Sequence, residues 1–349
     1  MTPMSEEDKA FLEAVMKDGI IDENQQMKTI LKDVTTSLEA MREKSDGKDV
    51  HVPLNEEEIE ELLLELRDIV EQIDYARAFA AMKGLPFLLG CASQRDVVPR
   101  SIRISCLGVL ATMCQNNPPV QTELLGLGSI RILTEIYFAE YPDELVPSEP
   151  PEECDGNIRA KTVQAMSANV RNNEMAEDLF CQIEDALRVI ASALGLFSQQ
   201  ETLPSPPASL QKRALFFLRA LITSDTSTMA RVRMFNDCIC YVCDNLICDF
   251  QGANVELREM SLGMIAQILT QKLSVNAVLS RKESLVATGV RRVAAIRELE
   301  GEKRDFANIE LELWESVLVL LSRAEPDHES AAAPAMIEHK KSGDTESLP

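Results

Sequence analysis

Four cysteines stand close together in the sequence and come nearest to a site for chemistry: Cys238, Cys240, Cys243 and Cys248. Cysteine thiolates at short spacing are typical zinc ligands, but a tetrahedral zinc ion needs four ligands that converge on one point. On a single helix these residues would point in widely different directions, because successive residues differ by about 100°. We therefore expect core cysteines and no metal site, and a zinc enzyme built on this cluster remains an alternative.

Other patterns that carry catalysis are missing. The three histidines, His51, His328 and His339, fall in segments that read as a linker and a tail, where no rigid element would orient a catalytic base. Residues 125–128 (LGLG) lack the preceding strand of a nucleotide-binding loop. The acidic run at residues 56–58 is explained by a helix start, where carboxylates interact favourably with the helix dipole. The chain is thus not expected to be an enzyme or to hold a cofactor.

Composition favours helices and argues against several partners. Hydrophobic residues make up 45% of the 349 residues and aromatic residues only 5%, and no segment alternates as a strand would, so we expect an all-α fold. The 57 acidic and 35 basic residues give a net charge of −22, which disfavours nucleic acids and anionic membrane surfaces. No apolar run reaches the roughly 20 residues of a membrane span. The odd count of nine cysteines indicates reduced thiols in a cytosolic protein.

The chain becomes repetitive from about residue 55. Similar helix starts recur at Ser101, Asn157, Ser209 and Glu256, each followed by about 15 residues with apolar positions at helical spacing, a polar break and a second helical run. Their separations of 56, 52 and 47 residues approach the roughly 40–47 of armadillo and HEAT units. Insertions at residues 142–156 and 203–207 account for part of the excess. We predict an armadillo-like right-handed helical solenoid, a fold that usually binds proteins in its concave groove.

Three regions are expected along the chain. Residues 1–50 form a flexible acidic segment with two short amphipathic helical patterns, the second over residues 27–41, and residues 43–49 read as a linker. Residues 51–324 form the repeat domain. It is closed by a helix over residues 305–323, whose expected apolar face consists of Phe306, Ile309, Leu313, Val317, Leu320 and Leu321. Residues 325–349, rich in Ala, Ser, Glu and Pro, form a disordered tail.

Specific residues resemble a known family. Residues 71–79 (EQIDYARAF) resemble a segment of the armadillo-type nucleotide exchange factors of heat shock protein 70, the cytosolic Hsp70-binding-protein family. Residues 115–121 (QNNPPVQ), followed by 125–128, are similar to the next unit of that family, and residues 27–31 match its lead-in. Tyr75 stands where the family has asparagine, Glu184 and Asp185 replace the glycine of the helix junction, and the insertion at 142–156 is unusually long.

The resemblance implies a co-chaperone that binds the nucleotide-binding domain of heat shock protein 70 and accelerates ADP release. It places the contact surface on the concave face, at Asp74, Ala76, Gln115, Asn116, Asn117, Arg171 and Arg213. Ala76 would allow close approach, the amides would donate or accept hydrogen bonds, and the guanidinium groups would bind acidic groups of the partner. The family also implies an N-terminal segment that competes with substrate polypeptides, here with Phe11, Leu12 and Met16. A working exchange factor is expected to be a monomer, because its concave face must stay free.

Simpler explanations exist for the predicted contact residues and for residues 1–50. The amides can simply cap helices, the arginines can pair with neighbouring carboxylates, and residues 1–50 can be a solvated tail. The main alternative function is a generic armadillo scaffold or adaptor. A nuclear-import adaptor needs a ladder of tryptophans, and this chain has only Trp314. A histone-type chaperone fits the net charge but needs long acidic runs, which are lacking.

Overall fold

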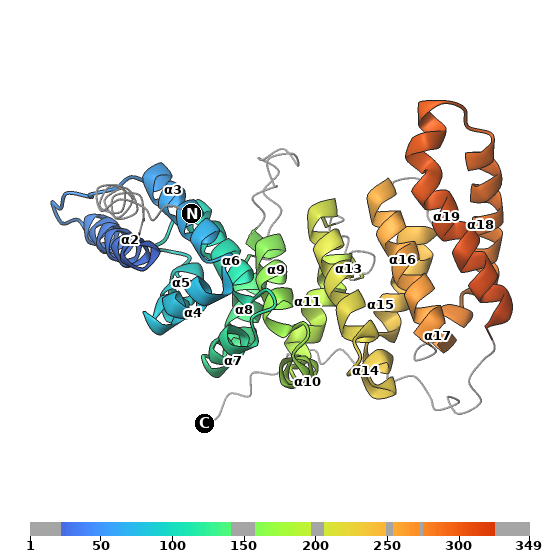
Figure 1. Ribbon diagram of the computed structural model, residues 1–349, viewed down its shortest axis with the longest axis horizontal. Helices are drawn as coiled ribbons and strands as arrows, with labels where there is room; N and C mark the ends of the chain where they lie inside the picture. The colour runs from blue at the N-terminus through green and yellow to red at the C-terminus, as the bar shows by residue number, and fades with distance from the viewer. Residues whose placement is uncertain (1–21, 141–157, 197–205, 249–253, 272–274, 325–349) are drawn as a thin grey trace, which may run out of the picture.

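The computed structural model describes residues 22–140, 158–196, 206–248, 254–271 and 275–324. Every regular element in these ranges is a helix, which confirms the prediction of an all-α fold. The helices stand side by side along the longest axis of the molecule, from α2 at one end to α18 and α19 at the other (Figure 1). The first insertion (142–156) and the tail (325–349) lie outside the described residues, as does most of the second insertion (203–207).

The longer helices form one continuous row in which each contacts the next. Its members are α3 (Glu56–Ile69), α6 (Arg100–Cys114), α9 (Ile158–Val170), α13 (Ala208–Thr223), α16 (Val255–Gln271) and α19 (Glu302–Arg323). We refer to them as the long row.

A second row packs along the long row and is also continuous. It consists of α5 (Gly84–Ser93), α8 (Ser129–Ala139), α11 (Glu184–Leu194), α15 (Asn236–Tyr241) with its π-helical continuation η2 (Val242–Ile247), and α18 (Lys282–Arg297). A third set of short helices precedes each member of the second row: α4 (Ile73–Ala81), α7 (Pro118–Gly126), α10 (Glu174–Gln182), α14 (Met229–Met234) and α17 (Val275–Leu279).

The recurring unit therefore has three helices, whereas the sequence pattern predicted two. A short helix, a second-row helix and a long helix follow one another five times within the described residues, from α4-α5-α6 to α17-α18-α19. The hydrophobic periodicity did not predict the short helices, because they have only five to nine residues and bury few side chains. For example, α7 buries only Val120, Gln121, Leu124 and Leu125.

The first described helix is part of the packed body. The spacing over residues 27–41 predicted a helix, and α2 (Glu23–Ser45) confirms it, running into the segment expected as a linker. Met27, Ile30 and Val34 are almost fully buried against α3 and α4 and belong to the same core as the repeats. Within the described residues the packed body thus includes α2 and does not start at the expected residue 51, because the apolar face of α2 packs on α3 and α4 of the first unit.

Helix junctions explain why certain residue types recur. Asn116 (φ 51°) follows the end of α6 and Asn172 (φ 60°) follows the end of α9, both in the left-handed region that asparagine tolerates better than most residues. Gly128 (φ 73°) opens α8 in the same conformation. At the corresponding start of α5 the left-handed residue is Lys83 (φ 68°), so Gly84 serves instead for close approach, since a Cβ there would clash with the ring of Phe79.

The closing helix buries Val317 and Leu321 of the expected apolar face, but its buried stripe is turned away from Phe306 and Ile309. Its buried stripe is Ala307, Glu310, Trp314, Val317 and Leu321, packed on α16 and α18. Phe306 and Ile309, predicted to face inward, are 81% and 60% exposed. The hydrophobic pattern misled because a charged residue, Glu310, occupies a central position of the true stripe, where Arg258, Arg292 and the indole of Trp314 donate hydrogen bonds to it.

A candidate partner-binding groove

Two adjoining cavities form a groove over the long row. One, of about 560 Å³, is lined from α3 to α9, and the other, of about 320 Å³, from α6 to α16. Gln115 and Gln164 line both, so the two cavities adjoin, and we refer to them together as the groove. The first is also lined by Arg67, Glu71, Ile73, Gly108, Thr112, Asn116 and Lys161, and the second by Ser167, Ala168, Arg171, Lys212, Arg213, Phe216, Glu256 and Met260.

Helical periodicity brings these side chains to one face. On α9 and the residue after it, Lys161, Gln164 and Arg171 recur at intervals of three and seven residues, which places them on a single stripe. Gly108, Thr112 and Gln115 form the corresponding stripe along α6. The groove is thus built from the polar stripes of consecutive long helices, while their apolar stripes pack into the core.

Basic residues dominate the groove although the chain is acidic overall. Burial lowers the pKa of Lys161, and the nearby positive charges of Arg213 and Arg67 lower it further. Burial also lowers the pKa of the Arg171 and Arg213 guanidinium groups. None of Lys161, Arg171 and Arg213 forms an ion pair with a carboxylate of the described residues, so their charges are not neutralised within this part of the chain.

The carboxylates of the groove do not offset this charge. Glu256 is an ion-pair partner of Lys212. Asp68, outside the lining, comes within 3.8 Å of Arg67, and both of these side chains are well exposed. Glu71 is the remaining acid of the lining. A groove with this balance favours a negatively charged partner.

Four of the seven predicted contact residues meet here. Gln115, Asn116, Arg171 and Arg213 all line the groove, although they come from three repeats. Arg171 also stacks over the ring of Phe216, with its guanidinium carbon 4.5 Å from the ring centroid. The alternative that Arg171 and Arg213 are held by neighbouring carboxylates finds no support among the described residues.

The other three predicted contact residues lie elsewhere. Ala76 is 1% exposed in the core face of α4 and so cannot present a surface to a partner, which corrects the prediction for this residue. Asn117 is equally buried; its Oδ1 accepts a hydrogen bond from Arg77 Nε at 3.4 Å, and its side chain does not cap α7, so its role is structural but is not the helix capping of the alternative reading. Asp74 is exposed on α4 but does not line the groove. Phe11, Leu12 and Met16 fall outside the described residues.

Sequence reasoning missed Arg67, Lys161, Gln164 and Phe216, which complete the groove. A lysine or glutamine between apolar positions of a helix ordinarily marks a solvated face, and nothing in a single helix distinguishes such a face from the wall of a groove. One signal was available: residues 115–117 (QNN) and 171–173 (RNN) are similar tripeptides at matching helix ends. Aligning the repeats on them would have pointed to the neighbouring helical stripes.

Gln121 fixes the ends of two long helices at the edge of the groove. Its Nε2 lies within hydrogen-bond distance of the carbonyl oxygens of Cys114 (3.1 Å), Ala168 (2.9 Å) and Arg171 (3.1 Å). The side chain is 3% exposed and therefore acts on the backbone of α6 and α9, not on a partner. Gln121 thus fixes the backbone at the ends of α6 and α9, from which the Gln115 and Arg171 side chains project.

The cysteine cluster does not form a metal site among the described residues, where no group of three or more potential ligands comes together. Cys238 and Cys243 are buried, and Cys240 and Cys248 are partly buried. Burial raises the pKa of the Cys238 thiol to about 12, so this side chain is a neutral thiol near neutral pH. His51 lies in the loop before α3, and the other two histidines are outside the described residues.

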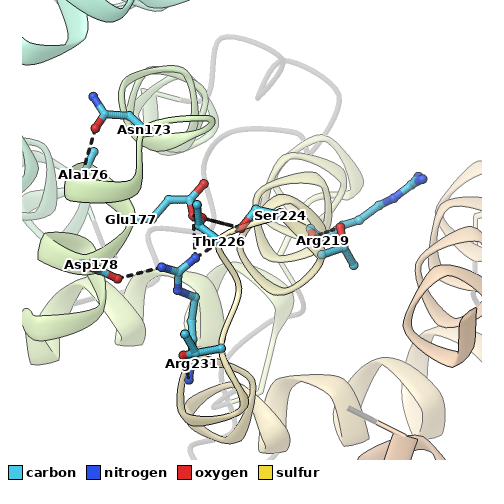
Figure 2. Close-up of polar contacts among 10 residues, drawn as sticks. Asn173, Ala176, Glu177, Asp178, Arg219, Ser224, Thr226 and Arg231 are labelled. Atoms are coloured by element: carbon cyan, nitrogen blue, oxygen red, sulfur yellow. Dashed lines mark hydrogen bonds and ion pairs between the residues drawn. The ribbon is translucent and has the colours of Figure 1, made fainter. Parts of the chain in front are cut away.

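A second polar cluster joins α10 to the start of the next unit (Figure 2). Arg231 donates to Glu177 Oε2 (2.5 Å) and Asp178 Oδ1 (2.7 Å), and Thr226 Oγ1 donates to the same oxygen of Glu177 at 2.7 Å. Arg231 and Glu177 have side chains only 3% and 1% exposed. Since both are well satisfied and closed to solvent, this cluster holds two repeats together and is not a candidate binding site.

Comparison with known proteins supports the fold class and no more. No family model matches the chain, and a search of curated proteins finds no match. Two engineered proteins solved by the Northeast Structural Genomics Consortium have similar structures. One is 13% identical with a TM-score of 0.51 and covers 84% of this chain and 96% of its own. The other is 11% identical with the same TM-score and covers 82% and 58%. In the described residues no helix is long and apolar enough to cross a membrane. In its described residues the chain is therefore an all-helical protein built from recurring three-helix units.

Proposed function

We propose that this protein is a non-catalytic co-chaperone that binds the nucleotide-binding domain of heat shock protein 70 in the groove and accelerates ADP release. In this proposal the three-helix units form an armadillo-type right-handed superhelix, with the long row on its concave side. The protein acts as a monomer in the cytosol, because self-association through the groove would exclude the partner.

One observation carries the proposal. Gln115, Asn116, Arg171 and Arg213 were identified by resemblance in sequence, across almost 100 positions, and they line one groove. Residues of three repeats line one groove only when they lie on the same face of the long row, and these four do. The unneutralised charges of Arg171 and Arg213 are also what a protein-binding surface needs, since guanidinium groups bind carboxylates in a fixed geometry.

The mechanism requires no reacting group. If the groove binds an open or distorted lobe of the chaperone better than the closed, ADP-holding lobe, it must weaken ADP binding by the same factor. The coupling comes from differential affinity alone, and no bond is made or broken. Phe11, Leu12 and Met16 would add competition with substrate polypeptides, which removal of residues 1–21 would test separately.

Stopped-flow release of a fluorescent ADP from a cytosolic heat shock protein 70 tests this function. We expect a large, saturable acceleration by the wild-type protein and loss of most of it in Arg213→Glu. Arg131→Glu is the matched control, because Arg131 is an exposed arginine on α8 outside the groove. Absence of acceleration with several chaperones would contradict the proposed function.

A generic protein-binding scaffold is the second candidate, and the same groove supports it. The scaffold hypothesis predicts that neither the wild-type protein nor Arg213→Glu changes the rate of ADP release. It also predicts that Arg213→Glu abolishes binding of a different protein partner. A nuclear-import adaptor is disfavoured further, since Trp314 is fully buried in the closing helix and lies away from the groove.

A further inference from the structure

The two parts of the groove differ in chemistry. The α3–α9 part holds Arg67 and Lys161, and Arg213 is close enough to lower the pKa of Lys161. The α6–α16 part holds Arg171, Lys212 and Arg213 and also two larger apolar side chains, Phe216, which is 45% exposed, and Met260. Gln115 and Gln164 line both parts, and within the α6–α16 part the guanidinium group of Arg171 covers the Phe216 ring.

Buried polar atoms in the groove have no partner in the described part of the chain. They are Gln164 Oε1, Ser167 Oγ and Arg171 Nε. Ser167 is only 4% exposed, and all three residues line the α6–α16 part. A buried polar group without a hydrogen bond costs free energy, and because these atoms are closed to solvent a partner would satisfy them only through a local shift of their side chains.

We infer that the groove binds an extended, acidic segment of a protein partner, with carboxylates at Lys161 and Arg213 and a neighbouring apolar side chain on Phe216 and Met260. This inference rests on the proposed function in one respect, that the groove is where a partner docks. It adds which segment of a partner the groove selects.

The positive charge of the groove favours an acidic segment over a basic or a neutral one. Lys161 lies in a field of other cations and its charged form is disfavoured by burial, so a carboxylate beside it would raise its pKa back toward the ordinary lysine value. A basic segment would add to the existing repulsion. A neutral apolar segment would cover Phe216 and leave the cations buried and unpaired, which is costly.

Fluorescence anisotropy with a labelled peptide tests the inference. The probe carries a run of glutamates followed by leucines, and its control has glutamine at every glutamate. We expect the acidic peptide to bind at least about tenfold more tightly, an advantage that shrinks as ionic strength rises. Equal binding of the two peptides, or no dependence on salt, would overturn the inference.

Variants locate the site. Lys161→Met keeps the aliphatic stem and removes the charge, and we expect about tenfold weaker binding of the acidic peptide and little change for the glutamine peptide. Gly108→Glu places a carboxylate in the groove, where a Cβ on Gly108 meets nothing within 4 Å, and should abolish binding without disturbing the fold. Gly90→Glu is its control, an equally unobstructed glycine on α5 outside the groove. Peptide binding unaffected by Gly108→Glu would contradict the assignment.

The two proposals fail differently. Acceleration of ADP release that is lost in Arg213→Glu, together with no preference for the acidic peptide, leaves the exchange function standing and removes the acidic specificity. Tight, salt-sensitive binding of the peptide without any effect on ADP release does the reverse.

Discussion

Arg171 and Phe216 join two consecutive helices of the long row, with the guanidinium carbon 4.5 Å from the ring centroid. Arg171 follows α9, and Phe216 lies on α13. The pair holds a charged side chain and an exposed aromatic ring in one place, which neither helix would do alone. Both residues line the α6–α16 part of the groove, where basic and apolar side chains occur together.

A double-mutant cycle should detect this coupling. We expect Arg171→Met and Phe216→Ala to lower the free energy of unfolding by amounts that are not additive, with a coupling of about 0.5–1 kcal/mol, typical of a partly exposed cation–π pair. Chemical denaturation of the wild type, both single variants and the double variant measures it. Fully additive effects would show that the stacking contributes nothing to stability.

Arg231 should be among the residues whose loss is most damaging to stability. Arg231→Met leaves the buried carboxylate of Glu177 without its cation, and breaking a buried pair in this way costs about 3–5 kcal/mol. Arg188→Met is the control, because Arg188 and its partner Asp185 are both more than half exposed, and such pairs contribute about 0–1 kcal/mol. Thermal unfolding of the two variants, followed by circular dichroism, distinguishes these cases. Similar melting temperatures would mean that the polar cluster of Figure 2 does not stabilise the contact between the two repeats.

Stability should fall at low pH in part through Glu310. Burial raises the pKa of its carboxyl, but hydrogen bonds and positive charge from Arg292 and Arg258 outweigh this and leave the pKa below its ordinary value. A carboxyl with a lowered folded-state pKa stabilises the fold above its unfolded-state pKa, and this contribution is lost as pH falls through the folded-state value. In Glu310→Gln we expect lower stability at neutral pH and a shallower loss on acidification. Parallel stability curves for the two proteins between neutral and acidic pH would contradict the prediction.

Gly289 marks the close approach of α18 to the closing helix. A Cβ at this position would lie 2.7 Å from Trp314 Cε3, so Gly289→Ala forces the buried indole or the helices apart. We expect a destabilisation of about 1–3 kcal/mol, as for other overpacked cores. Gly108→Ala, on α6 with open space around the Cβ, should instead stabilise by up to about 1 kcal/mol through helix propensity. Urea unfolding of both variants and the wild type tests whether the free energy of unfolding falls in Gly289→Ala and rises in Gly108→Ala.

The helical class, the start of each long helix and the second-row runs were predictable from the sequence. These properties depend on local periodicity and on helix capping. The capping box of Asn55 and Glu58 at the start of α3, for example, lies within a single helical turn. The helix over residues 27–41 was predictable for the same reason. Four groove residues, Gln115, Asn116, Arg171 and Arg213, came from resemblance and not from any local physical signal.

Tertiary packing decided the rest. Ala76 and Asn117 resemble surface residues in sequence, yet neighbouring helices bury them, because burial depends on which side of a short helix meets the next unit. Phe306 and Glu310 exchange their expected places, since two arginines from other helices make a buried carboxylate acceptable. Lys161 and Gln164 become part of a groove only when α6, α9 and α13 stand side by side. Amphipathic periodicity fixes which residues form a helix, but only the packing of one helix on another determines which of its polar faces is hollowed and charged.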